Sequence, residues 1–136
     1  MSIMESMQNM TVLVTGGAGF IGSHICDAII YQGGNVICLD NFLTGFRKNI
    51  EHLLGNKNFK LIEGDIRDID TCRKAMKNCT HVCHQAALGS VPRSVADPLT
   101  SNDINISGTL NIYFSAYEAG VKRIVFASSS SCYGDE

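Results

Sequence analysis

The sequence predicts an α/β fold, in which a doubly wound parallel sheet carries helices on both faces. Short apolar runs alternate with segments of helical periodicity from residue 11 to the end of the chain. Each connection is long enough to hold a helix, as a right-handed crossover between parallel strands requires. We therefore expect five strands in the spatial order 3-2-1-4-5, preceded by a polar tail over residues 1–10.

The first half of the chain supplies three of these strands. Residues 11–15 (TVLVT) form a short apolar run, typical of a strand that is buried on both faces. Residues 20–32 follow as an amphipathic helix, whose apolar stripe consists of Ile21, Ile25, Ala28 and Ile29. Residues 35–40 (NVICLD) are a second buried strand, residues 47–54 a short helix and residues 59–63 (FKLIE) a third strand.

The second half continues the same alternation. Residues 69–77 are helical by composition, and residues 81–85 (HVCHQ) are the fourth strand. A long helix is expected over residues 99–119, with one face marked by Ile106, Leu110, Phe114 and Tyr117. Residues 123–128 (RIVFAS) are the fifth strand, so residues 11–136 form one α/β domain.

Length and composition exclude several classes of protein. A chain of 136 residues has the size of one domain and can bury a core without disulfides or metals. Hydrophobic residues make up 45% of the chain and only 2 residues are prolines, which excludes a disordered linker or a collagen-like chain. The net charge of −2 excludes the basic footprint of a nucleic-acid-binding protein.

The tail and the cysteines indicate a reduced, cytoplasmic protein. Residues 1–10 have neither the basic start nor the apolar stretch of a signal peptide, and no run approaches the roughly 20 apolar residues of a membrane span. The only sequence cluster with metal-ligand chemistry is Cys79, His81, Cys83 and His84, and no second ligand pair accompanies it. We therefore expect reduced cysteines, no membrane partner and no metal site.

A glycine-rich segment, TGGAGFIGSH over residues 15–24, joins the first expected strand to the first expected helix. Gly16 permits a tight turn, Gly19 lets a pyrophosphate approach the backbone, and Gly22 lets the helix pack close to the strand. The start of the helix offers free N–H groups and the positive end of its dipole to phosphates. This pattern is typical of a Rossmann-type dinucleotide-binding domain, although a purely structural glycine turn is the alternative.

Acidic residues follow the second and third expected strands. Asp40 lies 24 residues after Gly16, where a carboxylate accepts hydrogen bonds from ribose hydroxyls and repels a 2′-phosphate, so that NAD is favoured over NADP. Asp65 and Ile66 suit an adenine, the carboxylate binding the exocyclic amine and Ile66 packing on the ring. The alternatives are a surface aspartate and a helix N-terminal aspartate, respectively. Small residues after the fourth strand leave room for the inner half of the cofactor.

Together these motifs resemble extended short-chain dehydrogenase/reductases that act on nucleotide sugars, the NAD-dependent epimerase/dehydratase family. The likeness runs from about residue 11 to the last residue. It rests on TGGAGFIGSH, LDNFLTG (39–45), EGDIRD (63–68), HQAALGSVPRS (84–94) and SSSSCYGD (128–135). HQAALGSVPRS together with the serine run is most similar to UDP-N-acetylglucosamine 4-epimerases.

The resemblance implies roles for particular residues. The pyrophosphate would be held by Gly16, Gly19, Phe20, Ile21 and Gly22, and the adenosine ribose by Asp40, Asn41, Phe42, Thr44 and Gly45. Adenine would meet Asp65 and Ile66, and the nicotinamide side would be bordered by Gln85, Ala86 and Ala87. Asn105 would brace the cofactor site, unless it is a solvated helix residue. The sugar would be approached by Gly89, Ser90, Val91 and Arg93, and its 2-acetamido group by Ser130 and Ser131.

The resemblance also implies a reaction. In this family the catalytic hydroxyl lies four residues before the tyrosine of a Tyr-Gly pair, so Tyr133 selects Ser129 within the serine run. The implied activity interconverts C4 epimers of a UDP-sugar of the UDP-GlcNAc/UDP-GalNAc type through a 4-keto intermediate, with hydride transferred to and from NAD. A homodimer is implied for the full-length enzyme. A polar serine loop is the alternative reading of this segment.

The sequence departs from the family pattern after Ser129. The family's base is a tyrosine whose pKa is lowered by a lysine four residues later, and the chain reaches Glu136 without such a pair. We therefore expect a sheet truncated before the remaining strands, no C-terminal substrate domain, and no activity of this chain alone. Three hypotheses stay open: part of an epimerase, part of a related nucleotide-sugar dehydratase or decarboxylase, or a non-catalytic NAD-binding module.

Overall fold

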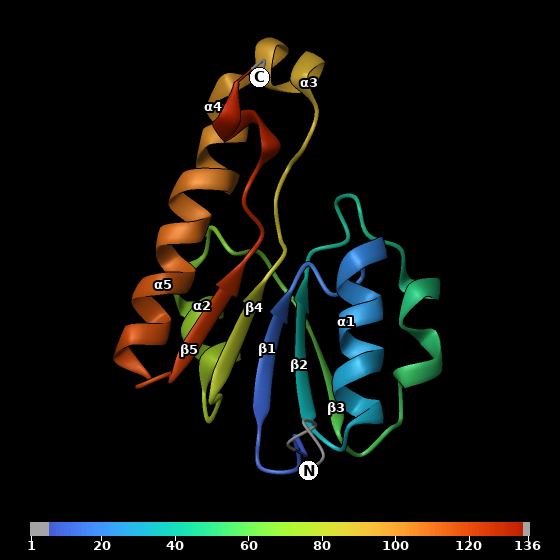
Figure 1. Cartoon of the computed structure of the whole chain (residues 1–136). Coiled ribbons are helices and arrows are strands. Elements are labelled where there is room, and N and C mark those ends of the chain that lie inside the picture. The colour runs from blue at the N-terminus through green and yellow to red at the C-terminus, as the bar shows by residue number, and fades with distance from the viewer. Residues whose placement is uncertain (1–5, 135–136) are drawn as a thin grey trace.

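A computed structural model describes residues 6–134, which contain a five-stranded parallel sheet in the order β3-β2-β1-β4-β5 (Figure 1). The strands are β1 (Thr11–Thr15), β2 (Asn35–Asp40), β3 (Phe59–Glu63), β4 (His81–His84) and β5 (Arg123–Phe126). The expected fold class and strand order are confirmed. The last two strands end one and two residues earlier than expected, and part of the expected tail lies outside the described residues.

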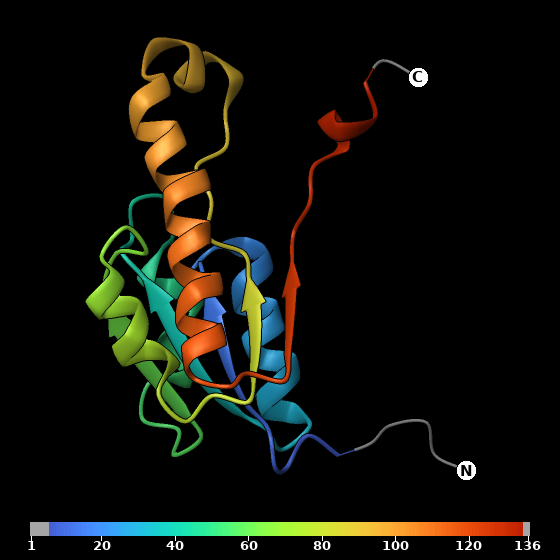
Figure 2. The same cartoon turned by 90° about the vertical axis from the view of Figure 1, so that its left-hand side faces the viewer.

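Helices cover both faces of the sheet. Helix α1 (Phe20–Tyr31) lies on one face, while α2 (Ile69–Met76) and α5 (Thr109–Glu118) lie on the other (Figure 2). Because successive strand residues point to opposite faces, β1 contributes Val14 to the core beneath α1 and Leu13 to the core beneath α2 and α5. The central strand β1 is thus buried on both faces between the helices, while the edge strand β5 stays partly exposed.

The connecting segments differ from the expected ones. Two short 3₁₀ helices, η1 (Arg47–Asn49) and η2 (Glu51–Leu53), replace the single helix expected over residues 47–54. The long helix consists of α4 (Pro98–Asn102), a π-helical stretch η3 (Asp103–Gly108) and α5. Helix α3 (Val91–Ala96) and the 3₁₀ helix η4 (Ser130–Tyr133) were not expected.

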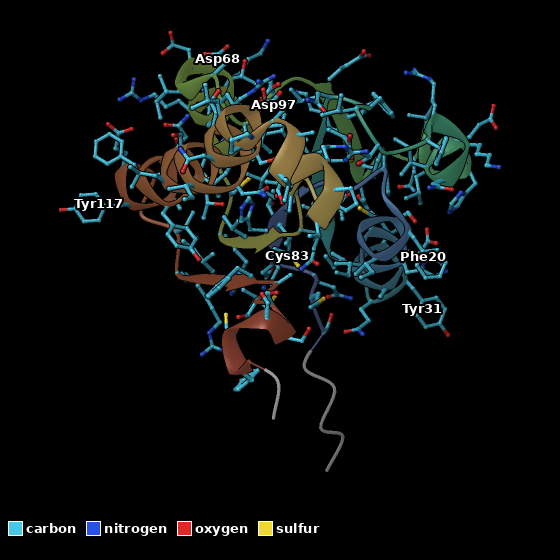
Figure 3. All side chains as sticks on the ribbon, turned by 90° about the horizontal axis from the view of Figure 1, so that it is seen from above. Phe20, Tyr31, Asp68, Cys83, Asp97 and Tyr117 are labelled. Carbon is cyan, nitrogen blue, oxygen red and sulfur yellow. The ribbon has the colours of Figure 1, made fainter. Side chains whose placement is uncertain are left out.

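The expected apolar face of α1 is correct only in part, and that of the long helix is wrong. The buried residues of α1 are Gly22, Ser23, Cys26 and Ile29. Of the expected stripe, Ile29 is buried and Ile25 packs against the core, whereas Ile21 and Ala28 are exposed. All four apolar residues expected on one face of the long helix (Ile106, Leu110, Phe114 and Tyr117) are also exposed. Figure 3 shows Phe20 and Tyr31 of α1 and Tyr117 of α5 pointing outward. The core side of α1 combines Gly22 with Ile29, and the core side of the long helix carries Ile104, Ile112 and Ala116.

The structure also bears on the cysteines, on metal binding and on membrane spans. All six cysteines are free thiols, four of them buried, and burial raises the pKa of Cys72 to about 12 and that of Cys79 to about 11. Within residues 6–134, no three His, Cys, Asp or Glu side chains gather as a metal ion would require. Across the same residues, every helix is too short or too polar to cross a membrane.

Candidate cofactor site

The glycine loop between β1 and α1 leaves open space where a phosphate group would lie. Gly16 has a left-handed φ of 68°, and a Cβ there would lie only 2.8 Å from the Ala86 nitrogen. A Cβ on Gly22 would overlap the Gly16 carbonyl group, so α1 packs here on a bare backbone. A Cβ on Gly19 would have the Gly16 carbonyl oxygen, at 3.2 Å, as its only close neighbour. Gly19 therefore borders free space, as a bound pyrophosphate would require.

The first turn of α1 is available to an anion. Gly19 is the N-cap residue, no side chain caps the helix, and no acidic residue lies in the first turn. The N–H groups of this turn have no partner within the helix and carry its positive dipole end. The side chains of Phe20 and Ile21 are 79% and 62% exposed. These two residues can thus serve a phosphate through their backbone N–H groups, with their side chains turned to solvent.

Asp40 at the end of β2 ties two loops together. Its carboxylate accepts hydrogen bonds from the Ala18 N–H at 2.9 Å and from the Phe42 N–H at 2.8 Å, one on each oxygen. Phe42 adopts a left-handed φ of 57° in this turn. The loop after β2 then closes on the glycine loop, since a Cβ on Gly45 would lie 3.0 Å from Ala18. Asp40 is 8% exposed, and each of its oxygens keeps a second lone pair for a ligand.

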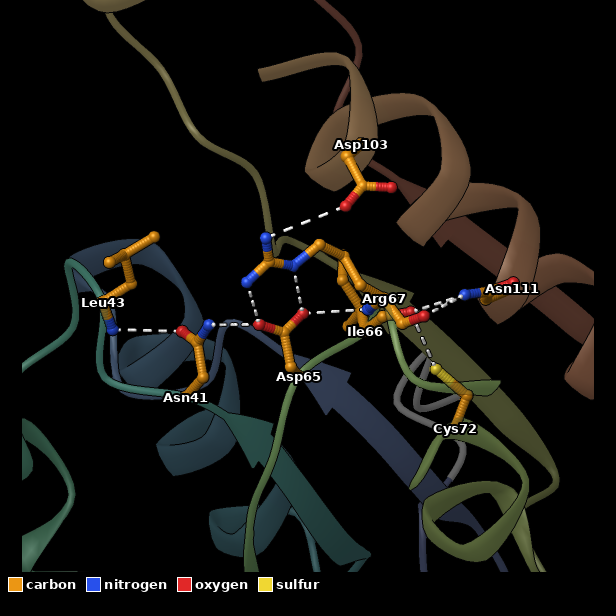
Figure 4. Close-up of polar contacts among 8 residues, drawn as sticks. All are labelled: Asn41, Leu43, Asp65, Ile66, Arg67, Cys72, Asp103 and Asn111. Carbon is orange, nitrogen blue, oxygen red and sulfur yellow. Dashed lines mark hydrogen bonds and ion pairs between the residues drawn. The ribbon is translucent and has the colours of Figure 1, made fainter. Parts of the chain in front are cut away.

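Asp65, after β3, lies at the centre of a polar network (Figure 4). Its carboxylate accepts hydrogen bonds from the Arg67 N–H and Nε at 2.9 and 3.0 Å, from Arg67 Nη2 at 2.7 Å and from Asn41 Nδ2 at 3.0 Å. Hydrogen bonds from the Arg67 guanidinium lower the pKa of Asp65 to about 2. Arg67 also reaches Asp103 in η3 at 3.8 Å. Four donors saturate the carboxylate, so an adenine amine could bind it only by displacing one, most easily the exposed Asn41.

The segment after β4 forms the opposite wall of the site. The N–H groups of Gln85 and Ala86 donate to Thr15 Oγ1 at 3.2 and 3.1 Å. Asn105, in η3, holds Leu88 from both sides: its Oδ1 accepts from the Leu88 N–H at 2.7 Å and its Nδ2 donates to the Leu88 carbonyl at 3.0 Å. Asn105 therefore braces this wall through the backbone, and is not merely a solvated helix residue.

The structure brings most of the expected cofactor residues into one pocket at the carboxyl edge of the sheet. These pocket residues are Gly16, Gly19, Asp40, Asn41, Thr44, Gly45, Asp65, Ile66, Gln85, Ala86 and Ala87. Phe42 and Asn105 do not line the pocket themselves and support residues that do. Sequence reasoning missed Leu39, Leu43, Gly64, Leu88 and Ile104, which also line it. The first four directly adjoin residues that the motifs identified, whereas Ile104 reaches the pocket through the placement of the long helix.

The expected sugar-facing residues lie outside this pocket. Gly89, Ser90, Val91 and Arg93 are exposed at the start of α3, where the Ser90 side chain caps the helix. Ser129, Ser130 and Ser131 are exposed in the segment after β5, and the hydroxyl oxygens of Ser129 and Ser131 lie 2.6 Å apart. Both segments extend beyond the carboxyl edge of the sheet (Figure 2). Their roles toward a sugar remain predictions.

Comparison with known proteins identifies the family of this domain. Residues 12–136 match the family described as the NAD dependent epimerase/dehydratase family. The chain belongs to this family. The expected cofactor, NAD, is confirmed as that of the family, and solved relatives contain it. The expected resemblance to nucleotide-sugar epimerases and dehydratases is confirmed as well.

Individual relatives differ in length. A UDP-glucose 4-epimerase from Klebsiella pneumoniae is 40% identical over 131 residues, covering 93% of this chain and 94% of that protein. A putative UDP-glucose 4-epimerase from Methanocaldococcus jannaschii is 44% identical over 126 residues, covering 91% of this chain. The chain spans only 40% of that archaeal relative.

Solved structures of the family have the same architecture. UDP-N-acetylglucosamine 4-epimerase from Methanobrevibacter ruminantium, in complex with UDP-N-acetylmuramic acid, superposes with a TM-score of 0.88 at 40% identity, over 96% of this chain and 41% of that one. A dTDP-glucose 4,6-dehydratase from Streptomyces venezuelae, with NAD and TYD bound, gives 0.79 at 33% identity, over 85% of this chain and 38% of that one. Epimerases and dehydratases thus share this domain.

Proposed function

We propose that this chain binds NAD in the pocket at the carboxyl edge of β1, β2 and β4. One observation carries the proposal: the glycine loop, Asp40 and residues 85–87, which are distant in the sequence, line the same pocket. Ligands of open parallel sheets bind at this edge, where the strand order reverses between β1 and β4.

The residues present fit a dinucleotide. The open side of Gly19 and the first-turn N–H groups of α1 suit the pyrophosphate. The free lone pairs of Asp40 suit the hydroxyls of the adenosine ribose, and its charge opposes a 2′-phosphate. The polar network of Asp65 and the buried Ile66 suit the adenine end of the cofactor.

We propose further that the domain serves a nucleotide-sugar epimerase that acts at C4 of a UDP-sugar, of the UDP-GlcNAc/UDP-GalNAc type. The structural likeness to the Methanobrevibacter enzyme supports this substrate class. Bound NAD supplies a hydride acceptor and donor. The hydroxyl of Ser129 would hold the sugar O4 by a hydrogen bond, and residues 89–93 with Ser130 and Ser131 would contact the sugar. A cytoplasmic location and, for a longer chain, a homodimer belong to the same proposal.

A related dehydratase is the second candidate, favoured by the likeness to the Streptomyces dehydratase. The 136 residues contain no tyrosine followed by a lysine four positions later, so neither reaction has its expected base within them. We therefore expect this chain to bind NAD but not to turn over a nucleotide sugar. A non-catalytic NAD-binding module would behave in the same way when tested in this form.

Two measurements test these proposals. Calorimetric titration of the chain with NAD and NADP should give binding of NAD and much weaker binding of NADP, and a chain that binds neither would contradict the cofactor site. The chain is then incubated with NAD and UDP-N-acetylglucosamine, where we expect no conversion. Ready conversion would show that the base lies within these residues. A longer gene product should yield the C4 epimer, whereas a 4-keto-6-deoxy sugar made from dTDP-glucose would indicate the dehydratase.

A further inference from the structure

His84 is a buried polar side chain behind the wall of the cofactor site. It ends β4, is 5% exposed and does not line the pocket. Its Nδ1 lies 2.6 Å from Thr15 Oγ1 at the end of β1, and its Nε2 lies 2.9 Å from Thr109 Oγ1 at the start of α5. Burial lowers the pKa of His84 to about 4, so the imidazole is neutral at physiological pH. A neutral imidazole has one donor nitrogen and one acceptor nitrogen.

The partners on both sides of His84 determine which nitrogen carries the proton. Thr109 Oγ1 donates its only hydrogen to the Asn105 carbonyl at 2.7 Å, so it must accept from His84 Nε2–H. On the other side, Thr15 Oγ1 accepts from the Ala86 N–H and shares the Gln85 N–H with the Thr15 carbonyl, which leaves its own hydrogen to donate to Nδ1. The Thr109 end assigns the Nε2–H tautomer, and the Thr15 end agrees with it.

The resulting chain of hydrogen bonds holds both ends of the segment 84–88. At one end, Thr15 receives the N–H groups of Gln85 and Ala86, and Ala86 packs directly on Gly16, where a Cβ would come within 2.8 Å of its nitrogen. At the other end, Thr109 bonds Asn105, whose side chain brackets Leu88. Moving His84 would therefore shift the pocket wall against the glycine loop.

We propose that His84 is a positioning residue of the cofactor site. Its Nε2–H tautomer connects the end of β1 to the π-helical stretch η3, and so fixes the backbone of residues 85–88 opposite Gly16. This inference rests on the proposed binding of NAD in the pocket. The π-helical stretch has a physical reason in this arrangement, since the Asn105 carbonyl accepts from the Thr109 hydroxyl while the Asn105 side chain reaches Leu88.

The test uses Thr109, because replacing His84 itself leaves the hydroxyl hydrogen of the buried Thr15 without its acceptor and endangers folding. Thr109→Val keeps the shape of the side chain and removes the acceptor of Nε2–H, whereas Thr109→Ser keeps the hydroxyl. We expect Thr109→Val to weaken NAD binding about three- to tenfold, the worth of one or two hydrogen bonds, and Thr109→Ser to restore it. Thr71→Val is the matched control, since Thr71 lies on α2, its hydroxyl donates to the N-cap residue Asp68, and Thr71 does not line the pocket.

Nitrogen-15 spectra of the imidazole test the tautomer, and hydrogen exchange at the Ala86 amide tests the coupling of His84 to the pocket wall; neither measurement needs the cofactor. Wild type should show the proton of His84 on Nε2, and Thr109→Val should change this signal and speed exchange of the Ala86 amide hydrogen. A proton on Nδ1, or equal NAD affinity for Thr109→Val and wild type, would overturn the proposal. If wild type binds no NAD, the proposed function fails, and the tautomer and amide exchange still decide on His84.

Discussion

The loops after β2 and β3 and the segment after β5, which lie on the two sides of the carboxyl edge of the sheet, differ in the hydrogen bonds that hold them in place. After β2 and β3, the carboxylates of Asp40 and Asp65 accept six hydrogen bonds between them, from loops that they tie together. Two of the six, from Ala18 to Asp40 and from Asn41 to Asp65, join residues 22 and 24 positions apart. After β5, by contrast, the Ser129 side chain bonds Ser131, two residues away, and the Ser129 carbonyl accepts from the Cys132 N–H, three residues away. The cofactor side is therefore held in part by contacts distant in the sequence, whereas the side-chain bonds of Ser129 are local.

The same contrast extends to apolar surface. The sheet beneath the first part of α1 is buried, with Val14 and Cys38 fully enclosed. The edge strand β5 leaves Val125 and Phe126 more than half exposed, and an apolar groove lined by Met10, Ile25 and Val125, among other residues, runs between α1 and the strands β4 and β5. Packing thus becomes less complete from the glycine loop toward β5.

The largest expected effect is on the cofactor side. Gly19→Val should abolish NAD binding without unfolding the domain, because the side chain would fill the space left for the pyrophosphate and meets only one backbone atom of the protein. Calorimetry measures the binding, and urea unfolding checks the fold. Gly89→Ala, where a Cβ meets nothing within 4 Å, is the control from the other side and should bind NAD normally. A folded Gly19→Val chain with normal affinity would reduce the glycine loop to a structural turn.

The next effect concerns the expected sugar side and requires a longer, active chain. Ser129→Ala should lower kcat by about 10²-fold or more, the loss expected for a hydrogen bond made to the reacting oxygen. Ser131→Ala should cost less and act mainly on KM, although the two hydroxyls lie within hydrogen-bond distance. Steady-state kinetics with UDP-N-acetylglucosamine separate the two. A greater loss of kcat at Ser131 would identify that residue as the catalytic serine.

Cofactor preference should change by a smaller factor. Asp40→Asn keeps an oxygen for one of the two backbone N–H groups and removes the charge, so the domain should stay folded. We expect the preference for NAD over NADP to fall about ten- to a hundredfold, the range for hydrogen bonds to a charged group. Calorimetric titration of wild type and Asp40→Asn with NAD and with NADP measures this preference. Glu63→Gln, at the exposed end of β3, removes a charge outside the pocket and should leave the preference intact.

The sequence predicts the strands better than the helix faces, for a physical reason. A strand buried on both faces is apolar throughout, so runs such as TVLVT identify it without knowledge of its neighbours. A helix face depends on what lies beside it: the long helix turns Ile104, Ile112 and Ala116 to the core, and Ile106 and Phe114 are exposed. Within the site, glycine spacing and Asp40 could be recognised from local pattern. The bonds of His84 to Thr15 and Thr109 join residues up to 69 positions apart and become visible only in the fold.

The smallest expected effect is an acid dependence of stability at Asp65. Its pKa of about 2, against an ordinary 3.8, means that the folded state binds this proton less readily than the unfolded chain. The stabilisation is therefore complete above about pH 4 and is lost as the pH falls toward 2. Because the Arg67 pair is partly open to solvent, Asp65 should contribute at most about 1 kcal/mol.

Urea unfolding from pH 6 to pH 2 measures this contribution as a difference between variants. Asp65→Asn should lose less stability than wild type over the acid range, because it has no proton to gain. Glu118→Gln is the matched control: its carboxylate also has a lowered pKa, through Arg73, but belongs to α5 and not to the pocket. Both variants should show a smaller change in unfolding free energy between pH 6 and pH 2 than wild type. Only Asp65→Asn should also weaken NAD binding, since it alone loosens the loops that would hold the adenine end. Equal NAD affinity for Asp65→Asn and Glu118→Gln would show that Asp65 contributes to the stability of the fold and not to cofactor binding.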